Sequence, residues 1–135
     1  MVTNTVLNQI GDTPLVKLKQ ASDLTGCNIY GKAEYFNPGE SVKDRAALFI
    51  VQDALKRKLI SKGGTIVEGT AGNTGIGLAV VCKEYDLKLK IVIPKTQSVE
   101  KKQTLRKLGA ELIEVDAVPY VNPKNYIKQS KQIAE

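Results

Sequence analysis

The order of apolar segments after residue 41 constrains the fold of this chain more than any other feature. Segments with helical spacing alternate with short apolar runs, and the runs at 65–69, 87–93 and 111–115 are typical of strands. One helical segment lies between each pair of these runs. Such a strand–helix–strand–helix–strand order is typical of a parallel sheet with right-handed crossovers. The sequence therefore predicts an α/β fold with a doubly wound parallel sheet.

Capping residues and apolar spacing predict the first helix of this part of the chain. It is expected over 41–60, with Ser41 as its N-cap and Gly63-Gly64 as its stop. Its apolar face is predicted from helical spacing to consist of Val42, Ala46, Phe49, Ile50, Ala54 and Leu59.

The later helices are predicted in the same way. A helix-compatible stretch follows the glycine-rich segment that begins at residue 69, and Ser98 can cap a helix that runs to Leu108 and ends at Gly109. Asn122-Pro123 has the pattern of an N-cap followed by a proline at the first helical position, which predicts a last helix up to Glu135.

The first 37 residues have a different pattern. Residues 16–18 and 28–35 are typical of short strands, and no strong helix is predicted between them. Asn37-Pro38-Gly39 is a turn tripeptide, which we take as a boundary. We therefore expect two parts, 1–37 and 38–135.

The composition excludes several classes of function. The 135 residues contain no histidine, which removes His-dependent nucleophilic catalysis and His-ligated metals, and no metal site is expected. Cys27 and Cys82 match neither a CxxC pair nor a disulfide framework, which favours free thiols in a reducing cytoplasm. No apolar run approaches the ~20 residues of a membrane-spanning helix, so no membrane association is expected.

The net charge of +6 raises the question of a nucleic-acid partner. The stretch 83–107 has eight basic and three acidic residues, a local charge of +5, and a phosphate-binding face is one interpretation. These residues, however, occupy the polar positions of a strand and an amphipathic helix, which favours solvated surface. Aromatic residues make up only 5%, and no nucleic-acid-binding motif accompanies the charge. We expect no nucleic-acid partner.

A glycine-rich segment, GTAGNTGIG (69–77), lies between a predicted strand and a predicted helix. Glycines permit positive φ and close backbone approach, and a helix start offers unpaired N–H groups and a positive dipole end. The pattern favours an anion site for a carboxylate or a phosphate, and a tight turn without a ligand is the alternative. It is neither a dinucleotide fingerprint, because Val80 replaces the third glycine, nor a P-loop, because no Lys-Ser/Thr follows.

Lys43 lies at the start of the predicted helix 41–60. The helix dipole disfavours the charged form of an amine there, which makes this lysine a candidate for Schiff-base chemistry. Because 17 of the 20 basic residues are lysines, an ordinary solvated side chain is the simpler interpretation.

Taken together, four segments resemble the cysteine synthase family, the O-acetylserine sulfhydrylases and cystathionine β-synthases among the fold-type II pyridoxal-phosphate enzymes. They stand in the order and spacing of that family: IGDTPLVKL (10–18), KAEYFNPGESVKDRAA (32–47), EGTAGNTGIGLA (68–79) and IPKTQSVEKKQTLRKLGAELIEV (93–115). The resemblance implies a tryptophan synthase β-like fold that is truncated here, because the chain matches less than half of a full-length member.

The resemblance also implies roles for individual residues. Lys43 matches the lysine that binds pyridoxal 5′-phosphate covalently and then removes the α-proton of the substrate. Asn73 matches the residue that hydrogen-bonds the 3′-oxygen of the cofactor. Thr70, Ala71, Gly72 and Thr74 match the loop that holds the substrate carboxylate. Ala71 departs from the serine that is commoner in the family, and so lacks its hydroxyl group.

The implied reaction is a β-replacement that forms L-cysteine from O-acetylserine and sulfide, in a cytoplasmic enzyme whose full-length relatives are homodimers. The family's phosphate-binding loop and the serine that meets the pyridine nitrogen lie beyond this sequence. Residues 1–37 are then strands of a larger domain whose remainder is missing, and residues 38–135 form the smaller domain. We expect little or no activity from this chain alone, and poor order or aggregation of residues 1–37.

Two alternatives remain open from the sequence. One is a catalytically inactive remnant that binds an anion or another subunit through residues 69–77. The other is a related enzyme, such as a cystathionine β-synthase or a threonine dehydratase. The cofactor hypothesis itself depends on one spatial expectation: the amine of Lys43 should face the glycine-rich segment across a crevice.

Overall fold

The structure, a computed structural model, describes residues 4–135. Its strands are β1 (Leu15–Lys17), β2 (Tyr30–Lys32), β3 (Thr65–Gly69), β4 (Lys88–Pro94) and β5 (Glu111–Val115). Its α-helices are α1 (Lys19–Thr25), α2 (Lys43–Lys56), α3 (Asn73–Glu84), α4 (Val99–Lys107) and α5 (Tyr126–Ala134). Two short 3₁₀ helices, η1 (Val6–Gln9) and η2 (Glu34–Phe36), complete the described elements.

The main sheet is parallel and has the strand order β3-β4-β5. Val67 pairs with Lys90, and Lys90 with Glu111, so the carboxyl ends of the three strands lie at one edge. Strands β3 and β5 have the predicted bounds, and β4 differs from its prediction by one residue at each end. The second half of the central strand, residues 91–94, is continuously apolar and buried because the sheet is covered on both faces there.

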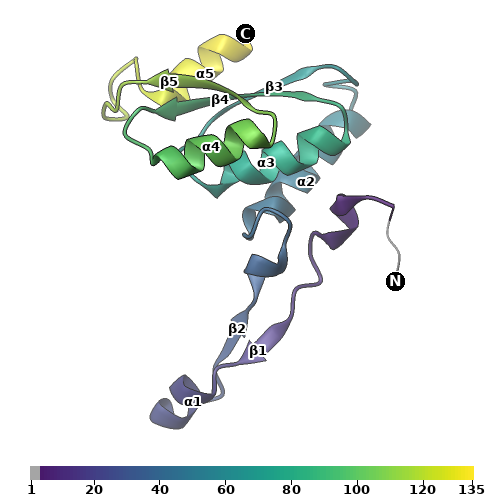
Figure 1. Cartoon of the computed structure of the whole chain (residues 1–135), viewed down its shortest axis with the longest axis vertical. Helices are drawn as coiled ribbons and strands as arrows, with labels where there is room; N and C mark the ends of the chain where they lie inside the picture. The colour runs from purple at the N-terminus through teal and green to yellow at the C-terminus, as the bar shows by residue number, and fades with distance from the viewer. Residues whose placement is uncertain (1–3) are drawn as a thin grey trace.

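Helices cover both faces of this sheet, as Figure 1 shows. Helices α3 and α4 pack on one face and α5 on the other, whereas α2 packs mainly on α3. The core lies between the sheet and helices α3 and α4, where Val81, Ile91 and Leu105 are almost completely buried. The predicted α/β fold with a doubly wound parallel sheet is confirmed, and the sheet is small.

The predicted apolar face of α2 is wrong. The buried residues of this helix are Asp44, Ala47 and Val51, whereas Phe49 and Ile50 are 69% and 59% exposed. Small side chains allow α2 to approach α3 closely, so the larger apolar residues point away from it. Helical spacing identified the element, but it did not identify which side of the helix the neighbouring helix would cover. The helix also ends at Lys56, four residues before the predicted end at residue 60.

The starts of α5 and α2 differ from those predicted, and the start of α4 agrees. Helix α5 begins at Tyr126 and not at Pro123, because the N-cap is Asn125, whose side chain accepts from the Ile127 N–H. Helix α4 begins after Ser98, as predicted, and the Oγ of Ser98 accepts a hydrogen bond from the Lys101 N–H at 3.3 Å. Ser41 precedes the observed N-cap, Val42, and its Oγ accepts from the Lys43 N–H at 3.2 Å.

The N-terminal segment forms an arm that extends away from the α/β body (Figure 1). Strands β1 and β2 pair antiparallel, with Val16 opposite Gly31. Helix α1, which has seven residues, connects them, although no strong helix was predicted between these strands. Five of the six strand residues are exposed, and Leu15 and Tyr30 are 63% and 52% accessible. A two-stranded sheet of this kind has little stability of its own.

Candidate functional site

Two helices place the candidate site residues near one another. Lys43 is the first residue of α2, and Asn73 is the first residue of α3. The helices touch at Gly77, where an added Cβ would lie 3.0 Å from the Lys43 carbonyl oxygen and 3.1 Å from Asp44 Cα. Gly77 is one turn, about 6 Å along the helix axis, from Asn73. The backbone of Lys43 therefore lies beside the first turn of α3.

The turn before α3 consists of residues 69–72, and Gly72 is the N-cap. No side chain caps α3. The Thr70 hydroxyl instead accepts from the Gly72 N–H at 3.1 Å, and the Thr70 N–H donates to the Val92 carbonyl. The turn thus lies at the carboxyl edge of the sheet, the position where parallel α/β sheets bind ligands.

Three of the glycines of this segment are explained by close packing, and none of the four has the positive φ that glycine also permits. An added Cβ at Gly69 would lie 2.6 Å from Ser130 Oγ and 2.8 Å from Ile127 Cα on α5. One at Gly75 would lie 3.0 Å from Thr70 Cγ2, and Gly77 abuts α2.

Gly72 is different from the other three. Its φ of −127° suits any residue, and an added Cβ would meet only Thr70 Oγ1, at 4.0 Å. No contact within the described part of the chain requires a glycine there. Open space over the backbone at the start of an uncapped helix is what an incoming ligand needs.

The predicted site residues lie at the surface of this chain. Lys43 and Asn73 are exposed, and Thr70, Ala71, Gly72 and Thr74 are partly buried. Neither Lys43 nor the 69–72 turn lines any of the four cavities described within residues 4–135. The expected crevice is therefore not enclosed by residues 4–135 themselves, although its two sides are neighbours.

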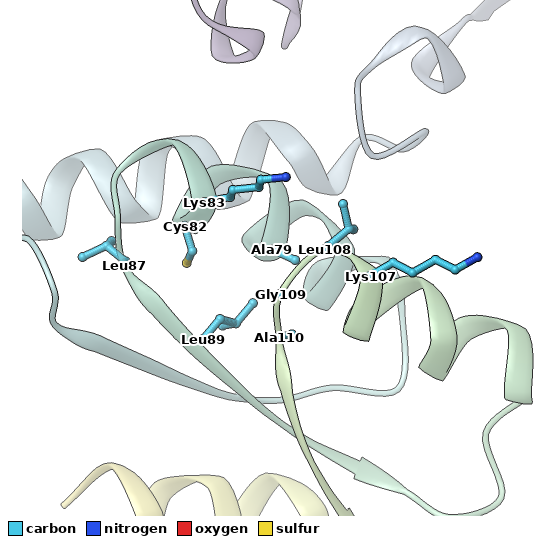
Figure 2. Close-up of a pocket in the computed structure, with 9 residues that line it drawn as sticks. All are labelled: Ala79, Cys82, Lys83, Leu87, Leu89, Lys107, Leu108, Gly109 and Ala110. Carbon is cyan, nitrogen blue, oxygen red and sulfur yellow. The ribbon is translucent and has the colours of Figure 1, made fainter.

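The cavity in Figure 2 lies elsewhere, at the C-terminal half of α3. It has a volume of about 210 Å³ and is open to solvent. Its floor is apolar, with Cys82 and Leu89, and Lys83 and Lys107 extend from its rim. Burial raises the pKa of the Cys82 thiol to about 11, so this cysteine is protonated and unreactive at neutral pH.

A polar network that the sequence analysis did not identify holds the start of α2. The Arg45 guanidinium makes a two-point ion pair with Glu34, at 2.9 and 3.0 Å, and also donates to Thr13 Oγ1. Hydrogen bonds from Arg45 hold the pKa of the Glu34 carboxyl at about 2, with further bonds from Thr13 and Asn37. This network joins η2 and the N-terminal segment to the first turn of α2.

Two buried side chains complete this anchor. Asn37 is 2% exposed; its amide donates to the Ser41 carbonyl at 3.0 Å, and its Oδ1 accepts from the Gly11 N–H at 2.9 Å. The Asp44 carboxyl is fully buried and accepts from the Gly39 N–H, and burial raises its pKa. The motif around Lys43 is therefore a rigid structure that fixes where the lysine backbone lies.

We predict that Glu34→Gln reduces stability at neutral pH and that this deficit fades in acid. The pKa of Glu34 is lower in the folded chain than its ordinary value of 4.5, so its stabilising contribution is present above pH 4.5. It is lost as the pH falls toward about 2. Urea unfolding of both proteins between neutral pH and pH 2 measures this difference.

The control for this prediction is Glu40→Gln, which changes the same chemical group on an exposed side chain. Asp44 contributes with the opposite sign in all three proteins, because burial raises its pKa. Glu34→Gln removes only the charge of Glu34, which is the weakest of the influences on that pKa. A stability deficit of Glu34→Gln that is constant from pH 7 to pH 2 would contradict the prediction.

The basic stretch 83–107 is not uniformly solvated, contrary to the expectation. Lys102 is 8% exposed and forms an ion pair with Glu114 at 2.7 Å, and Arg106 binds the other oxygen of Glu114. Lys101 reaches the glycine-rich turn, where its Nζ donates to the Ala71 carbonyl at 3.1 Å. Sequence spacing does not reveal this contact, because the two residues are 30 positions apart.

Other groups in the described chain show no metal or disulfide chemistry. Within residues 4–135 no three His, Cys, Asp or Glu side chains are arranged to hold a metal ion. Cys27 is exposed and Cys82 is buried, and both are free. None of the helices in the described region is long and apolar enough to cross a membrane.

A family comparison decides how this site is interpreted. Residues 6–135 match the family described as pyridoxal-phosphate dependent enzymes. The chain belongs to this family. The expectation of pyridoxal 5′-phosphate as cofactor and of a fold-type II architecture is thereby confirmed.

The chain is similar to several curated and solved members of this family. The chain is 58% identical over 126 residues to cysteine synthase 1 of Neurospora crassa, and 55% identical over 132 residues to that of Emericella nidulans. These matches cover 93% and 98% of this chain, but 34% and 36% of the relatives. The solved O-acetylserine dependent cystathionine beta-synthase of Helicobacter pylori superposes with a TM-score of 0.85 at 39% identity, over 99% of this chain and 44% of that one.

The chain thus spans about a third of the length of these two curated relatives. Its residues fit one part of a cofactor site. They supply a primary amine at Lys43, an uncapped helix start, and the open backbone of Gly72.

Proposed function

We propose that this chain provides the lysine and the substrate-binding loop of a cysteine synthase, which forms L-cysteine from O-acetylserine and sulfide. The observation that carries the proposal is the packing of α2 on α3 at Gly77. This packing places the Lys43 backbone beside the first turn of α3, which directly follows Gly72. A lysine for covalent attachment and an anion site for a carboxylate are what this chemistry requires at close range.

Each site residue has a role in this proposal. Lys43 holds the cofactor and takes the α-proton of the substrate on its Nζ. Asn73 hydrogen-bonds the 3′-oxygen of the cofactor. The backbone at Ala71 and Gly72, together with the hydroxyl groups of Thr70 and Thr74, orients the substrate carboxylate at the positive end of α3.

When bound, pyridoxal 5′-phosphate withdraws electrons from the α-carbon of the substrate. The overall reaction removes acetate and the α-proton from O-acetylserine, and sulfide then adds at the β-carbon as a proton returns to the α-carbon. The protein's contribution is to hold the amine and the carboxylate site in fixed relation, since orientation accounts for much of such a rate enhancement.

The N-terminal arm supports the proposal that residues 1–37 belong to a larger domain. Its exposed apolar residues, such as Leu15 and Tyr30, are what strands present to a neighbouring sheet. Residues 38–135 then form the smaller domain of a cytoplasmic enzyme that is a homodimer at full length. The relatives' remaining sequence would supply the second wall of the crevice and the phosphate-binding loop.

Two other functions compete with this one. A related enzyme with a different nucleophile is favoured by the likeness to the Helicobacter pylori protein, whose name describes a cystathionine beta-synthase. An inactive, anion-binding remnant is the second. It would retain anion binding after Lys43→Ala but lose it after substitution of Asn73 or Thr74.

Fragment complementation tests the proposed reaction. We expect that the chain alone, given pyridoxal 5′-phosphate, O-acetylserine and sulfide, forms little or no cysteine. Addition of the remaining two-thirds of the Neurospora crassa relative should restore cysteine formation, because that piece would cover the exposed arm and close the site. Homocysteine offered in place of sulfide tests for a cystathionine β-synthase, and threonine offered in place of O-acetylserine tests for a threonine dehydratase. Full cysteine formation by the chain alone, or none after verified association of the two pieces, would contradict the proposal.

A further inference from the structure

Lys101 on α4 contacts the candidate substrate loop directly, and the sequence analysis assigned it only to solvated surface. Its Nζ donates to the Ala71 carbonyl at 3.1 Å, and its side chain is partly buried. The contact joins the first turn of α4 to the residue just before the N-cap of α3. It is a long-range contact between two elements that meet at the carboxyl edge of the sheet.

The packing of α4 on α3 fixes this contact. Leu105 lies one helical turn after Lys101 and on the same face. Leu105 is 1% exposed, and its Cδ2 would lie 3.4 Å from a Cβ added at Gly75. Residue 101 therefore faces residue 71 and residue 105 faces residue 75. The two residues of each pair are four positions apart from those of the other pair, on both sides of the contact. Lys101 thus projects from the side of α4 that packs on α3, and its ammonium group reaches the turn.

The charge of Lys101 is not neutralised by any acidic side chain of the described residues. Its basic neighbours are paired: Lys95 with Asp116 at 2.8 Å, and Lys102 and Arg106 with Glu114. Lys101 instead contacts a neutral carbonyl group. An ammonium group has three donors, and the Ala71 carbonyl accepts from one of them.

We propose that Lys101 is a positioning residue for the substrate carboxylate. Its hydrogen bond holds the Ala71 peptide so that the turn presents its backbone N–H groups, and its positive charge strengthens anion binding there. This inference rests on the proposed function, since it assumes that the turn receives a carboxylate. It assigns to α4 a part in substrate binding, in addition to covering the sheet.

The test measures carboxylate binding without the cofactor. Acetate is titrated into the full 135-residue chain, and the amide signals of Gly72 and Asn73 are followed by NMR. We expect Lys101→Gln to weaken acetate binding about five-fold, the effect of losing one partly exposed ion pair. Lys101→Arg should retain most of the affinity, because it preserves the charge and the donors.

The matched control is Lys107→Gln, which removes the same charge from an exposed position at the other end of α4. It should leave acetate affinity within about two-fold of the unsubstituted chain, because Lys107 lies roughly 9 Å further along the axis of α4 than Lys101 and salt weakens a charge interaction over that added distance. Thermal unfolding of each variant shows whether the fold is intact. If Lys101→Gln unfolds, Lys101→Met retains the stem and replaces it in the comparison.

Three results would overturn the inference: equal acetate affinity in Lys101→Gln and the unsubstituted chain, equal losses in Lys101→Gln and Lys107→Gln, or no acetate-dependent shift at Gly72 and Asn73. None of these depends on Lys43 or on the cofactor. A chain that fails to attach pyridoxal 5′-phosphate but shows the Lys101-dependent shift contradicts the proposed function and leaves this inference standing.

Discussion

Replacing Lys43 with alanine is expected to abolish site-specific attachment of pyridoxal 5′-phosphate to this chain. Attachment requires a primary amine beside the loop that binds the rest of the ligand, and Lys43 is the lysine that begins α2 next to α3. The chain is incubated with the cofactor and reduced with borohydride, and the modified peptide is identified by mass spectrometry. The unsubstituted chain should carry the label predominantly on the peptide that contains Lys43.

The chain has 17 lysines, so nonspecific labelling must be separated from this result. Lys56→Ala is the matched control, because Lys56 is an exposed lysine at the opposite end of the same helix. It should leave the label on Lys43 unchanged. A label spread evenly over many lysines, with the same total in Lys43→Ala, would show that this lysine has no special role.

Replacing Gly77 with valine is expected to cause the largest loss of stability among the substitutions considered. Its Cβ would lie 3.0 Å from a backbone oxygen of α2 and 3.1 Å from backbone atoms of Asp44, and backbone cannot move aside as a flexible side chain does. The two further methyl carbons must push α2 away from α3. Overpacking of a tight core contact costs roughly 2–3 kcal/mol. Urea unfolding followed by circular dichroism measures this loss.

Gly72→Ser provides the control for this prediction. At position 72 an added Cβ has open space and ordinary φ, and serine is a favoured N-cap residue. Its stability should match or slightly exceed that of the unsubstituted chain. The two glycines are five residues apart in one motif, so opposite outcomes would separate a packing role from a ligand-facing one. Equal destabilisation by both substitutions would refute this division.

The glycine-rich segment shows how far sequence reasoning reached at the site. Its place between a strand and a helix was predicted correctly, because β3 and α3 have strong local patterns. Two reasons for its glycines were possible from the sequence, positive φ and close backbone approach. The structure shows the second, because helices α5 and α2 pack against Gly69 and Gly77 from distant parts of the chain. Local sequence carries no information about which distant backbone will approach.

The same limit explains the other errors. Helical spacing in 41–60 predicted a helix, but it did not show which side would be buried. The structure buries the side with Ala47 and Val51, whose short side chains let α2 pack closely on α3. The short helix α1 was missed because its seven residues show no clear apolar face. The contact of Lys101 with Ala71 depends on how α4 lies against α3.

The sequence by itself determined the order of strands and helices, the parallel sheet that this order implies, and the motifs that mark a pyridoxal-phosphate enzyme. These properties depend on residues near one another in the chain, where spacing and capping act directly. Only the tertiary structure decided that Lys43 begins a helix packed against Gly77, that Glu34 and Arg45 anchor this helix, and that Lys101 reaches the loop. Those contacts join residues 11 to 34 positions apart, and they exist only because burial of the core brings α2, α3 and α4 together.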